Sequence, residues 1–446
     1  MLHKFIIFWL FAASLNAQEN KYSFTLQEAI GFAIKNNRAI QNAERDVKIA
    51  VQTKRETTAT GLPQINANIG YNYWLEQQVS LIPAEFFGGA PGQFAEVLFG
   101  TKQTMNSAVT VKQKLFDGSY LVALQAAKVF LEISKNSKEK TINEISKIVA
   151  YSYGNVLLVE ENLEIVNSNI ALLEKNVWEV SKVYESGLIE EESLQQLQLT
   201  LSGLKSNQRY SKRLKDLAYQ MFNNSLGLDL TAAVVLTNSL DELVVFYSTL
   251  TTSRSENEFE EVIDFKIAVN SVKSDELLLK LEKSKALPTL NAFVNGSYSG
   301  NSQRFSFTEN SQKWFGASLF GVTLDIPVFS SFKRSASTQR ARLNLEKSKS
   351  NLEDTTNKIK LEINTARSNY EFAFEDYEIK KKALNLSKNI ATKNEIKFFE
   401  GLTTSFDLSQ AQRQLYIAQQ DYLQSMLNIL LKGVDLESLI NTPLKN

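Results

Sequence analysis

Few side chains in this sequence can carry out acid–base or covalent chemistry. The chain has 446 residues, with one histidine, His3, and no cysteine. His3 lies within residues 1–17, which have the pattern of a cleavable signal peptide: Lys4, an apolar run from Phe5 to Leu15, then Ala17 before the expected cut. The mature chain therefore has no thiol nucleophile, disulfide, Cys/His zinc site or Ser-His-Asp triad.

Carboxylates remain as candidate groups, but they do not form a convergent site in the sequence. Lys and Arg number 49, and Asp and Glu also number 49, so the net charge is close to zero. That balance argues against nucleic acid as a partner, because such binding needs concentrated basic charge. The run Glu190-Glu191-Glu192 is expected to be a solvated helix start. We expect no cofactor and no metal, and keep a secreted enzyme that uses carboxylates alone, such as a glycosidase, as a remote alternative.

The longest predicted elements are two matching helical hairpins. Apolar residues recur at spacings of three and four from Ile142 to Tyr184, and again about 214 residues later, from Ile359 to Phe398. Seams of this length predict coiled-coil helices. One helix from Ser119 to Ser186 would be on the order of 100 Å long. Each array ends at a glycine, Gly187 and Gly401, after which a second helix returns.

The repeat predicts the organisation of the whole chain. The returning helices are expected to end at Gly227 and Gly433, and the apolar runs at 232–236 and 243–246 to be short strands or packing segments. The predicted divisions are a signal peptide at 1–17, a first structural repeat at 18–230 with a β-hairpin at about 64–116 and a tip near 187, an equatorial or linker segment at 231–262, a second repeat at 263–438 with a β-hairpin at about 289–329 and a tip near 401, and a C-terminal tail at 439–446.

Between the helices, short segments alternate apolar and polar residues with a period of two. Ile65 and Ile69, for example, alternate with Asn66 and Asn68. Strands of about ten residues with one apolar face and aromatic residues near their ends are typical of outer-membrane barrels. The alternating segments are 64–73, 105–115 (Met105, Val109, Val111 and Leu115 on one side), 290–298 and 314–326, and the intervening stretches 77–103 and 299–313 are expected to be exposed loops. The aromatics predicted at the membrane interface are Tyr71, Tyr73, Trp74 and Trp314.

Four strands cannot close a barrel, and an open sheet edge cannot face lipid. Self-association is therefore required, and two to four copies would give about 8 to 16 strands. The predicted fold class is an α+β membrane protein, with long antiparallel coiled-coil hairpins and four strands per protomer contributing to an oligomeric barrel. A soluble periplasmic coiled-coil adaptor or scaffold is the alternative. It accounts for the hairpins but leaves the alternating strands unexplained.

Several short motifs occur in order along the chain, and some of them are repeated in its second half. They are Phe24-Thr25-Leu26-Gln27-Glu28-Ala29-Ile30 with Asn36-Asn37, then Gly61-Leu62-Pro63-Gln64 and its repeat Ala286-Leu287-Pro288-Thr289, then Leu115-Phe116-Asp117-Gly118 and Ile326-Pro327-Val328-Phe329-Ser330-Ser331. In the order and repetition of these motifs, the sequence resembles the TolC family of outer-membrane channels. The resemblance covers nearly all of residues 22–438.

This resemblance implies a homotrimer with a barrel of about 12 strands in the outer membrane, in contact with lipid, and helices extending into the periplasm. It implies a passive exit duct for small molecules that does no chemistry itself. Its partners would be a periplasmic adaptor protein and an inner-membrane pump. The alternative within the same family is the outer-membrane component of a type I protein secretion system.

The resemblance also suggests residue roles at the two helical tips. Gly187-Leu188 and Gly401-Leu402-Thr403 match the family's adaptor-contacting tips. The family narrows its tunnel with acidic side chains six and nine residues after the second tip glycine, where this chain has Asp407 and Gln410. A ring of three Asp407 would select cations or respond to acid, whereas the simpler alternative is a carboxylate favoured at a helix start. Phe398 occupies the place of the family's aromatic tip lock but has no hydroxyl to donate.

A polar stripe distinguishes the second hairpin from the first. Lys380, Ser387 and Asn394 replace the apolar residues Val166, Leu173 and Val180 at matching seam positions. From this difference we predict that the second hairpin lines the aqueous tunnel and that the first hairpin packs outside it.

Overall fold

The computed structural model describes residues 22–249 and 257–440. The predicted signal peptide and residues 441–446 of the predicted tail lie outside the described residues. The chain forms two compact units that do not correspond to the two sequence repeats, because each repeat contributes to both units. One unit comprises Met1–Arg45, Lys135–Ile267 and Glu353–Asn446, and the other Asp46–Ser134 and Ala268–Leu352.

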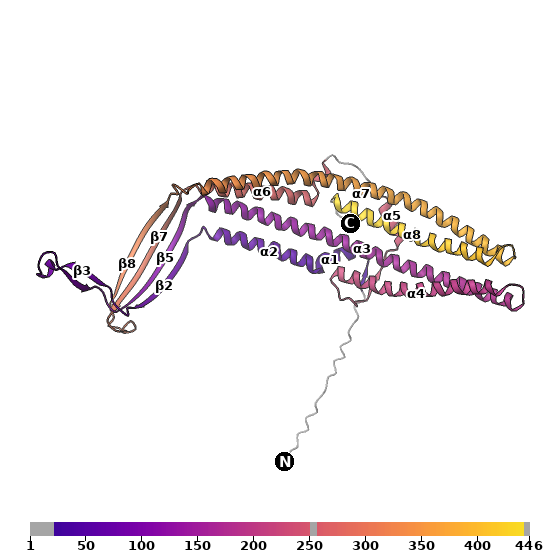
Figure 1. Cartoon of the computed structure of the whole chain (residues 1–446), viewed down its shortest axis with the longest axis horizontal. Coiled ribbons are helices and arrows are strands. Elements are labelled where there is room, and N and C mark those ends of the chain that lie inside the picture. Colours follow the sequence, from indigo (N-terminus) through magenta and orange to yellow (C-terminus); the bar gives the residue numbers. More distant parts are fainter. Residues whose placement is uncertain (1–21, 250–256, 441–446) are drawn as a thin grey trace, which may run out of the picture. The chain divides into compact units, whose positions relative to one another are not determined.

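In the second unit, the four alternating segments form one antiparallel sheet, as predicted. Its strands are β2 (Gln64–Tyr73), β5 (Gln103–Asp117), β7 (Thr289–Ser302) and β8 (Trp314–Asp325). They are hydrogen-bonded in the order β2-β5-β7-β8, so the two sequence hairpins meet where β5 pairs with β7 (Figure 1). Strands β2 and β8 are the outer strands, and each has one edge with no partner strand among the described residues.

The register of this sheet aligns the apolar positions across all four strands. Val111 on β5 lies opposite Ile65 on β2 and Val294 on β7, and Val294 lies opposite Phe320 on β8. Because side chains alternate between the faces of a sheet, these residues share one face. The next row, on the other face, comprises Asn66, Thr110, Asn295 and Leu319, so that face is polar with an apolar exception on β8.

A β-bulge corrects one assignment within this pattern. Leu115 was predicted to continue the apolar series of β5, but the pairing with β7 shifts between Lys114 and Phe116. Phe116 is therefore the residue that faces Leu290. A bulge adds one residue to a strand and so changes which side chains share a face.

The stretch predicted as the exposed loop 77–103 contains regular structure. Strands β3 (Val79–Pro83) and β4 (Phe94–Leu98) pair antiparallel, and the 3-10 helix η1 (Ala84–Phe87) follows β3. We call residues 79–98 the β3–β4 ribbon. The expected exposed loop thus contains a short hairpin, in which Val79, Ile82, Phe94 and Val97 are residue types that favour strands.

The predicted long helices are present. Helix α3 runs over 68 residues and α7 over 67 residues, and among the described helices none is long and apolar enough to cross a membrane. The helices of the first half are α1 (Leu26–Asn36), α2 (Arg38–Ala59), α3 (Gly118–Glu185) and α4 (Glu191–Leu226), and those of the second half are α6 (Ile263–Ser284), α7 (Lys333–Phe399) and α8 (Ser405–Leu439).

Residues 231–262 contain a short strand and a helix. Strand β6 (Val234–Leu236) pairs in parallel with β1 (Tyr22–Phe24), and the apolar run at 243–246 belongs to helix α5 (Leu240–Ser248), whose Leu243 and Val244 pack in the core. Ser239 and Glu242 form a capping box that starts this helix. The 3-10 helix η2 (Glu258–Glu260) follows.

The prediction that the second returning helix ends at Gly433 was wrong. Gly227 does end α4 in the left-handed conformation, but α8 continues through Gly433 to Leu439. A Cβ atom at Gly433 would lie 2.4 Å from Cδ1 of Tyr247 on α5. The two glycines at matching positions thus have different roles, since Gly227 terminates a helix whereas Gly433 permits close packing against Tyr247.

Tyr247 and Glu437 form a buried polar pair beside this packing contact. Tyr247 is fully buried and Glu437 is 7% exposed. The Glu437 Oε2 atom has no hydrogen-bond partner among the described residues. Burial raises the pKa of Glu437 to about 7, and the Tyr247 hydroxyl acts in the opposite direction. The folded state therefore holds a proton on this carboxylate up to neutral pH.

We expect the stability of the protein to fall as pH rises from about 4.5 to about 7 because of Glu437. The native state binds the extra proton in this range, so the stabilisation is complete below the unfolded pKa and lost above the folded one. Its size is on the order of 3 kcal/mol per protomer. Guanidinium unfolding at pH 5 and pH 8 measures it. Glu437→Gln should remove most of the pH dependence, whereas Glu353→Gln, at an exposed site on α7, should retain it. Equal pH dependence in both variants would contradict the assignment.

Candidate functional site

An aromatic cluster marks one end of the four-stranded sheet. The ring of Tyr71 on β2 lies 5.9 Å from the rings of both Phe305 and Phe307, and Phe307 lies 6.1 Å from Trp314 on β8. The Tyr71 hydroxyl donates a hydrogen bond to Gln103 Oε1 at 3.1 Å. Two of the predicted interface aromatics, Tyr71 and Trp314, are thus joined through phenylalanines. Strand periodicity did not identify these phenylalanines, because they lie in the loop that follows β7.

The other two predicted aromatics lie where β2 ends. Lys102 Nζ lies 5.3 Å from the ring centre of Tyr73, and the backbone N–H of Trp74 donates to the Lys102 carbonyl at 2.9 Å. Both rings are about half exposed. Aromatic rings with a polar edge or a cationic neighbour suit the membrane–water interface. Their interfacial role remains a prediction.

The first helical tip is built by hydrogen bonds typical of a glycine helix stop. Gly187 has φ +76°. Its N–H donates to the Tyr184 carbonyl at 2.9 Å, and the Leu188 N–H donates to the Val183 carbonyl at 3.3 Å. These two bonds are the Schellman motif, which satisfies the last carbonyls of α3. The motif leaves the Leu188 side chain 77% exposed.

The second tip repeats this geometry. Gly401 has φ +73°, its N–H donates to the Phe398 carbonyl at 3.0 Å, and the Leu402 N–H donates to the Lys397 carbonyl at 2.8 Å. Leu402 is 70% exposed. In a Schellman motif the residue after the glycine usually packs back on its helix. Two exposed leucines at equivalent points therefore give each hairpin an apolar tip.

Asp407 is a helix-capping residue. Its Oδ2 atom accepts hydrogen bonds from Thr404 Oγ1 at 2.6 Å, Thr403 Oγ1 at 3.0 Å and the Thr404 N–H at 3.2 Å. The bonds from Thr404 and Thr403 lower the pKa of Asp407 below its usual range. Asp407 of a single chain is therefore ionised at neutral and mildly acidic pH, and its response to acid in a ring of three remains a prediction. Its side chain is exposed, as is that of Gln410.

Phe398 lies in an apolar cluster between helices. It packs against a small core whose buried members are Leu173, Val180, Leu197 and Leu408. Its ring meets that of Phe399 edge to face at 5.6 Å. Packing thus replaces the hydroxyl bond that the family resemblance suggested for this position.

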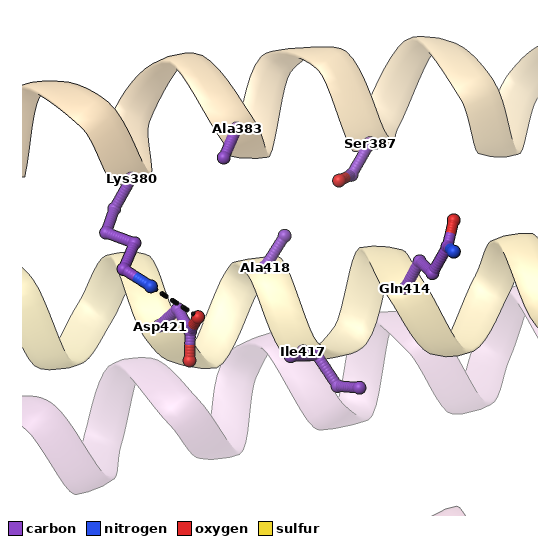
Figure 2. A pocket seen from close by; sticks show the side chains of 7 residues that line it. All are labelled: Lys380, Ala383, Ser387, Gln414, Ile417, Ala418 and Asp421. Atoms are coloured by element: carbon purple, nitrogen blue, oxygen red, sulfur yellow. Dashed lines mark hydrogen bonds and ion pairs between the residues drawn. The ribbon is translucent and has the colours of Figure 1, made fainter.

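The stripe Lys380, Ser387 and Asn394 is partly buried on α7. Lys380 Nζ lies 2.8 Å from Asp421 Oδ2 on α8, and this hydrogen bond raises the pKa of Lys380. Figure 2 shows the two side chains pointing toward each other across an open groove of about 240 Å³, which Ser387 also lines. Asn394 donates to the Ile390 carbonyl of its own helix. Two of the three residues thus line a groove between α7 and α8, and their contact with tunnel water remains a prediction.

Three asparagines spaced by seven on α3 were missed, because the sequence analysis followed only the apolar seam. Asn162 Nδ2 donates to Ser211 Oγ on α4 at 3.2 Å. Asn169 Nδ2 donates to Gln419 Oε1 on α8 at 2.9 Å, and Asn176 Nδ2 donates to Glu395 Oε1 on α7 at 3.0 Å. A buried asparagine that repeats at heptad spacing fixes the register between helices. This asparagine row links α3 to the three other helices of the two hairpins.

Polar groups without partners occur on α8 close to these bonds. Ser409 Oγ, Gln412 Oε1 and the Tyr416 hydroxyl are buried without a hydrogen-bond partner among the described residues. Burial raises the pKa of Tyr416 to about 12. Each buried polar group without a partner costs roughly 1–3 kcal/mol. The packing around this part of α8 is therefore less favourable than a fully apolar or fully hydrogen-bonded interface.

The four-stranded sheet with one apolar face, together with the paired long helical hairpins, defines the class of outer-membrane channel proteins. Residues 265–442 match the model of the family described as outer membrane efflux protein. The outer membrane protein TolC of Vibrio cholerae is 20% identical over 405 residues, which are 90% of this chain and 86% of that protein.

Solved structures share the fold over almost the whole chain. The outer membrane protein VceC of Vibrio cholerae matches with a TM-score of 0.73 and 14% identity, covering 93% of this chain and 95% of that one. The open-state MtrE outer membrane channel of Neisseria gonorrhoeae matches with a TM-score of 0.74 and 16% identity, covering 94% and 89%. The chain is thus similar to the TolC family of outer-membrane efflux proteins, and the predicted class of function, an exit duct in the outer membrane, is confirmed.

Proposed function

We propose that three copies of this chain form a passive duct for small molecules, loaded by an inner-membrane pump through a periplasmic adaptor protein. The observation that carries this proposal is the sheet whose two outer edges have no partner strand within residues 22–249 and 257–440, and whose one apolar face is in register across four strands. Unpaired backbone groups cannot remain in lipid.

Pairing between copies removes both free edges. The sheet is antiparallel throughout, so β8 of one copy can pair antiparallel with β2 of the next. Three copies give a closed barrel of about 12 strands, which is wide enough for a water-filled interior. The apolar row then faces lipid and the row of Asn66, Thr110 and Asn295 faces water.

Extraction and conductance test this function together. The protein should leave the outer membrane only with detergent, migrate as a trimer and produce stepwise conductance in planar lipid bilayers. Recovery as a monomer in the osmotic-shock supernatant would instead support the soluble adaptor or scaffold.

The tips are the proposed adaptor contact, supported by the exposed Leu188 and Leu402. Replacing both leucines with aspartate should abolish cellular efflux, measured as the minimal inhibitory concentration of an exported compound, while bilayer conductance stays unchanged. Leu199→Asp on α4, where the leucine is also 69% exposed, is the matched control. Efflux that survives the double substitution, or is equally lost with Leu199→Asp, would contradict the assignment.

A ring of three Asp407 carboxylates is the proposed cation-selective constriction. Asp407→Asn should lower the ratio of cation to anion permeability, measured as a reversal potential in a salt gradient. Selectivity that is retained by Asp407→Asn would exclude Asp407 as the selective group.

A further inference from the structure

The β3–β4 ribbon exposes apolar side chains on a hairpin that pairs with no further strand in the part of the chain that the structure describes. Its five pairs of facing residues run from Val79 opposite Leu98 to Pro83 opposite Phe94. Leu81 is 63% exposed, Phe94 65% and Leu98 56%. Phe86 and Phe87, in the turn, are 79% and 66% exposed. A two-stranded hairpin is at best marginally stable in water. These side chains therefore need a covering surface.

The charge of the segment narrows the choice of that surface. Residues 75–101 contain Glu76, Glu85 and Glu96 and no lysine or arginine. Binding to an anionic lipid surface relies on basic residues, so a layer of lipid phosphates is a poor partner. Glu85 accepts a hydrogen bond from the Gly92 N–H at 3.3 Å, which closes the turn.

The chain connectivity places the base of the ribbon beside a neighbouring copy. The ribbon connects β2 to β5 at the strand ends opposite those that join α2 and α3. Strand β2 is an outer strand of the sheet, so in the trimer it borders the next protomer. The ribbon is therefore rooted at the outer mouth of the barrel, next to the contact between copies.

The ribbon is long enough to meet its counterparts across the mouth. Twelve strands about 4.8 Å apart and tilted by about 40° form a barrel with a radius on the order of 12 Å. Five residues connect Tyr73 to Val79, a reach of up to about 16 Å, and the five residues of β3 add about 16 Å. Three ribbons can thus extend past the centre of the mouth.

We propose that the three β3–β4 ribbons of a trimer pack against one another by their apolar side chains and cap the outer mouth of the duct. This inference rests on the proposed trimeric channel. Apolar burial holds the cap together. The three Glu96 carboxylates, one on each ribbon beside Leu81, repel one another and limit its strength, so that the cap can open for cargo.

Cysteine cross-linking tests the contact in the full-length protein, which has no cysteine of its own. Phe86→Cys and Leu81→Cys probe the turn and the strand of the ribbon, and Asn310→Cys, in the exposed β7–β8 loop, is the matched control. Copper phenanthroline applied to outer membranes should link up to about two thirds of the ribbon-variant chains into disulfide dimers, since one cysteine in each trimer remains unpaired. The linkage should reduce bilayer conductance several-fold, and dithiothreitol should restore it.

The failure of this inference can be told apart from the failure of the proposed function. Unmodified protein that neither forms trimers nor conducts would refute the channel, and with it the cap. Trimers that conduct, with ribbon cysteines that react with maleimide but form no dimers, would overturn the cap alone. Dimer formation by Asn310→Cys to the same extent would also overturn it, because general crowding would then explain the links.

Discussion

Val294→Lys is expected to abolish assembly of the channel in the outer membrane, whereas Asn295→Lys, one residue further along β7, should leave assembly intact. The two positions face opposite sides of the sheet. Val294 lies in the apolar row with Val111 and Phe320. Asn295 lies opposite Thr110, to whose Oγ1 atom its amide donates at 2.7 Å.

The difference follows from the solvent that each face meets. Lysine on the lipid face near the bilayer centre costs about 2–4 kcal/mol, and a trimer carries the substitution three times, which gives a total of roughly 6–12 kcal/mol. Lysine at position 295 meets water inside the barrel and costs about 1 kcal/mol for the lost hydrogen bond. Its positive charge should also reduce cation conductance.

Heat-resistant trimer in purified outer membranes measures assembly, and single-channel recording measures conductance. Both variants replace a strand residue with the same side chain, so a general effect of lysine on folding would affect them equally. The assignment of Val294 to the lipid face would be contradicted if Val294→Lys assembled at the normal level. It would also be contradicted if neither Val294→Lys nor Asn295→Lys formed trimers.

Periodicity predicted the elements whose residues repeat over a long distance. The apolar seams of α3 and α7 span many heptads, so one polar residue within the α3 seam, Ser152, did not obscure the pattern. The alternation in 64–73 likewise predicted β2, because one face of an antiparallel sheet is apolar along its whole length. The two tips were found because a left-handed glycine ends each helix.

Features that depend on contacts distant in sequence were not predictable in this way. Gly433 matched Gly227 in the repeat, but the approach of Tyr247, from another helix, determines its role. The asparagine row on α3 became meaningful only when its partners on α4, α7 and α8 were known. The β3–β4 ribbon was overlooked because Gly88, Gly92 and Pro91 within it suggested a loop.

Replacing Asn169 and Asn176 together with alanine is expected to hold the tunnel open. These residues join α3 of the first hairpin to α8 and α7 of the second. Asn176, only 1% exposed, bonds to a carboxylate, an interaction worth about 1.5–3 kcal/mol, and the neutral Asn169 bond is worth about 1 kcal/mol. A combined loss on the order of 3 kcal/mol would shift a two-state equilibrium by about a hundredfold in each protomer.

Asn162→Ala is the matched control for this double substitution. It removes the same side chain from the same row on α3, but its partner Ser211 belongs to α4, within the first hairpin. Bilayer recordings should show a several-fold higher mean conductance for Asn169→Ala/Asn176→Ala and no change for Asn162→Ala. Similar conductance in the unmodified protein, the double variant and Asn162→Ala would mean that the asparagine row only sets the register of the helices. A gain confined to the double variant would instead mean that the bonds between the hairpins hold the tunnel closed. The unpaired Ser409, Gln412 and Tyr416 groups favour that second outcome, because an interface with buried polar groups already unsatisfied loses little more when it separates.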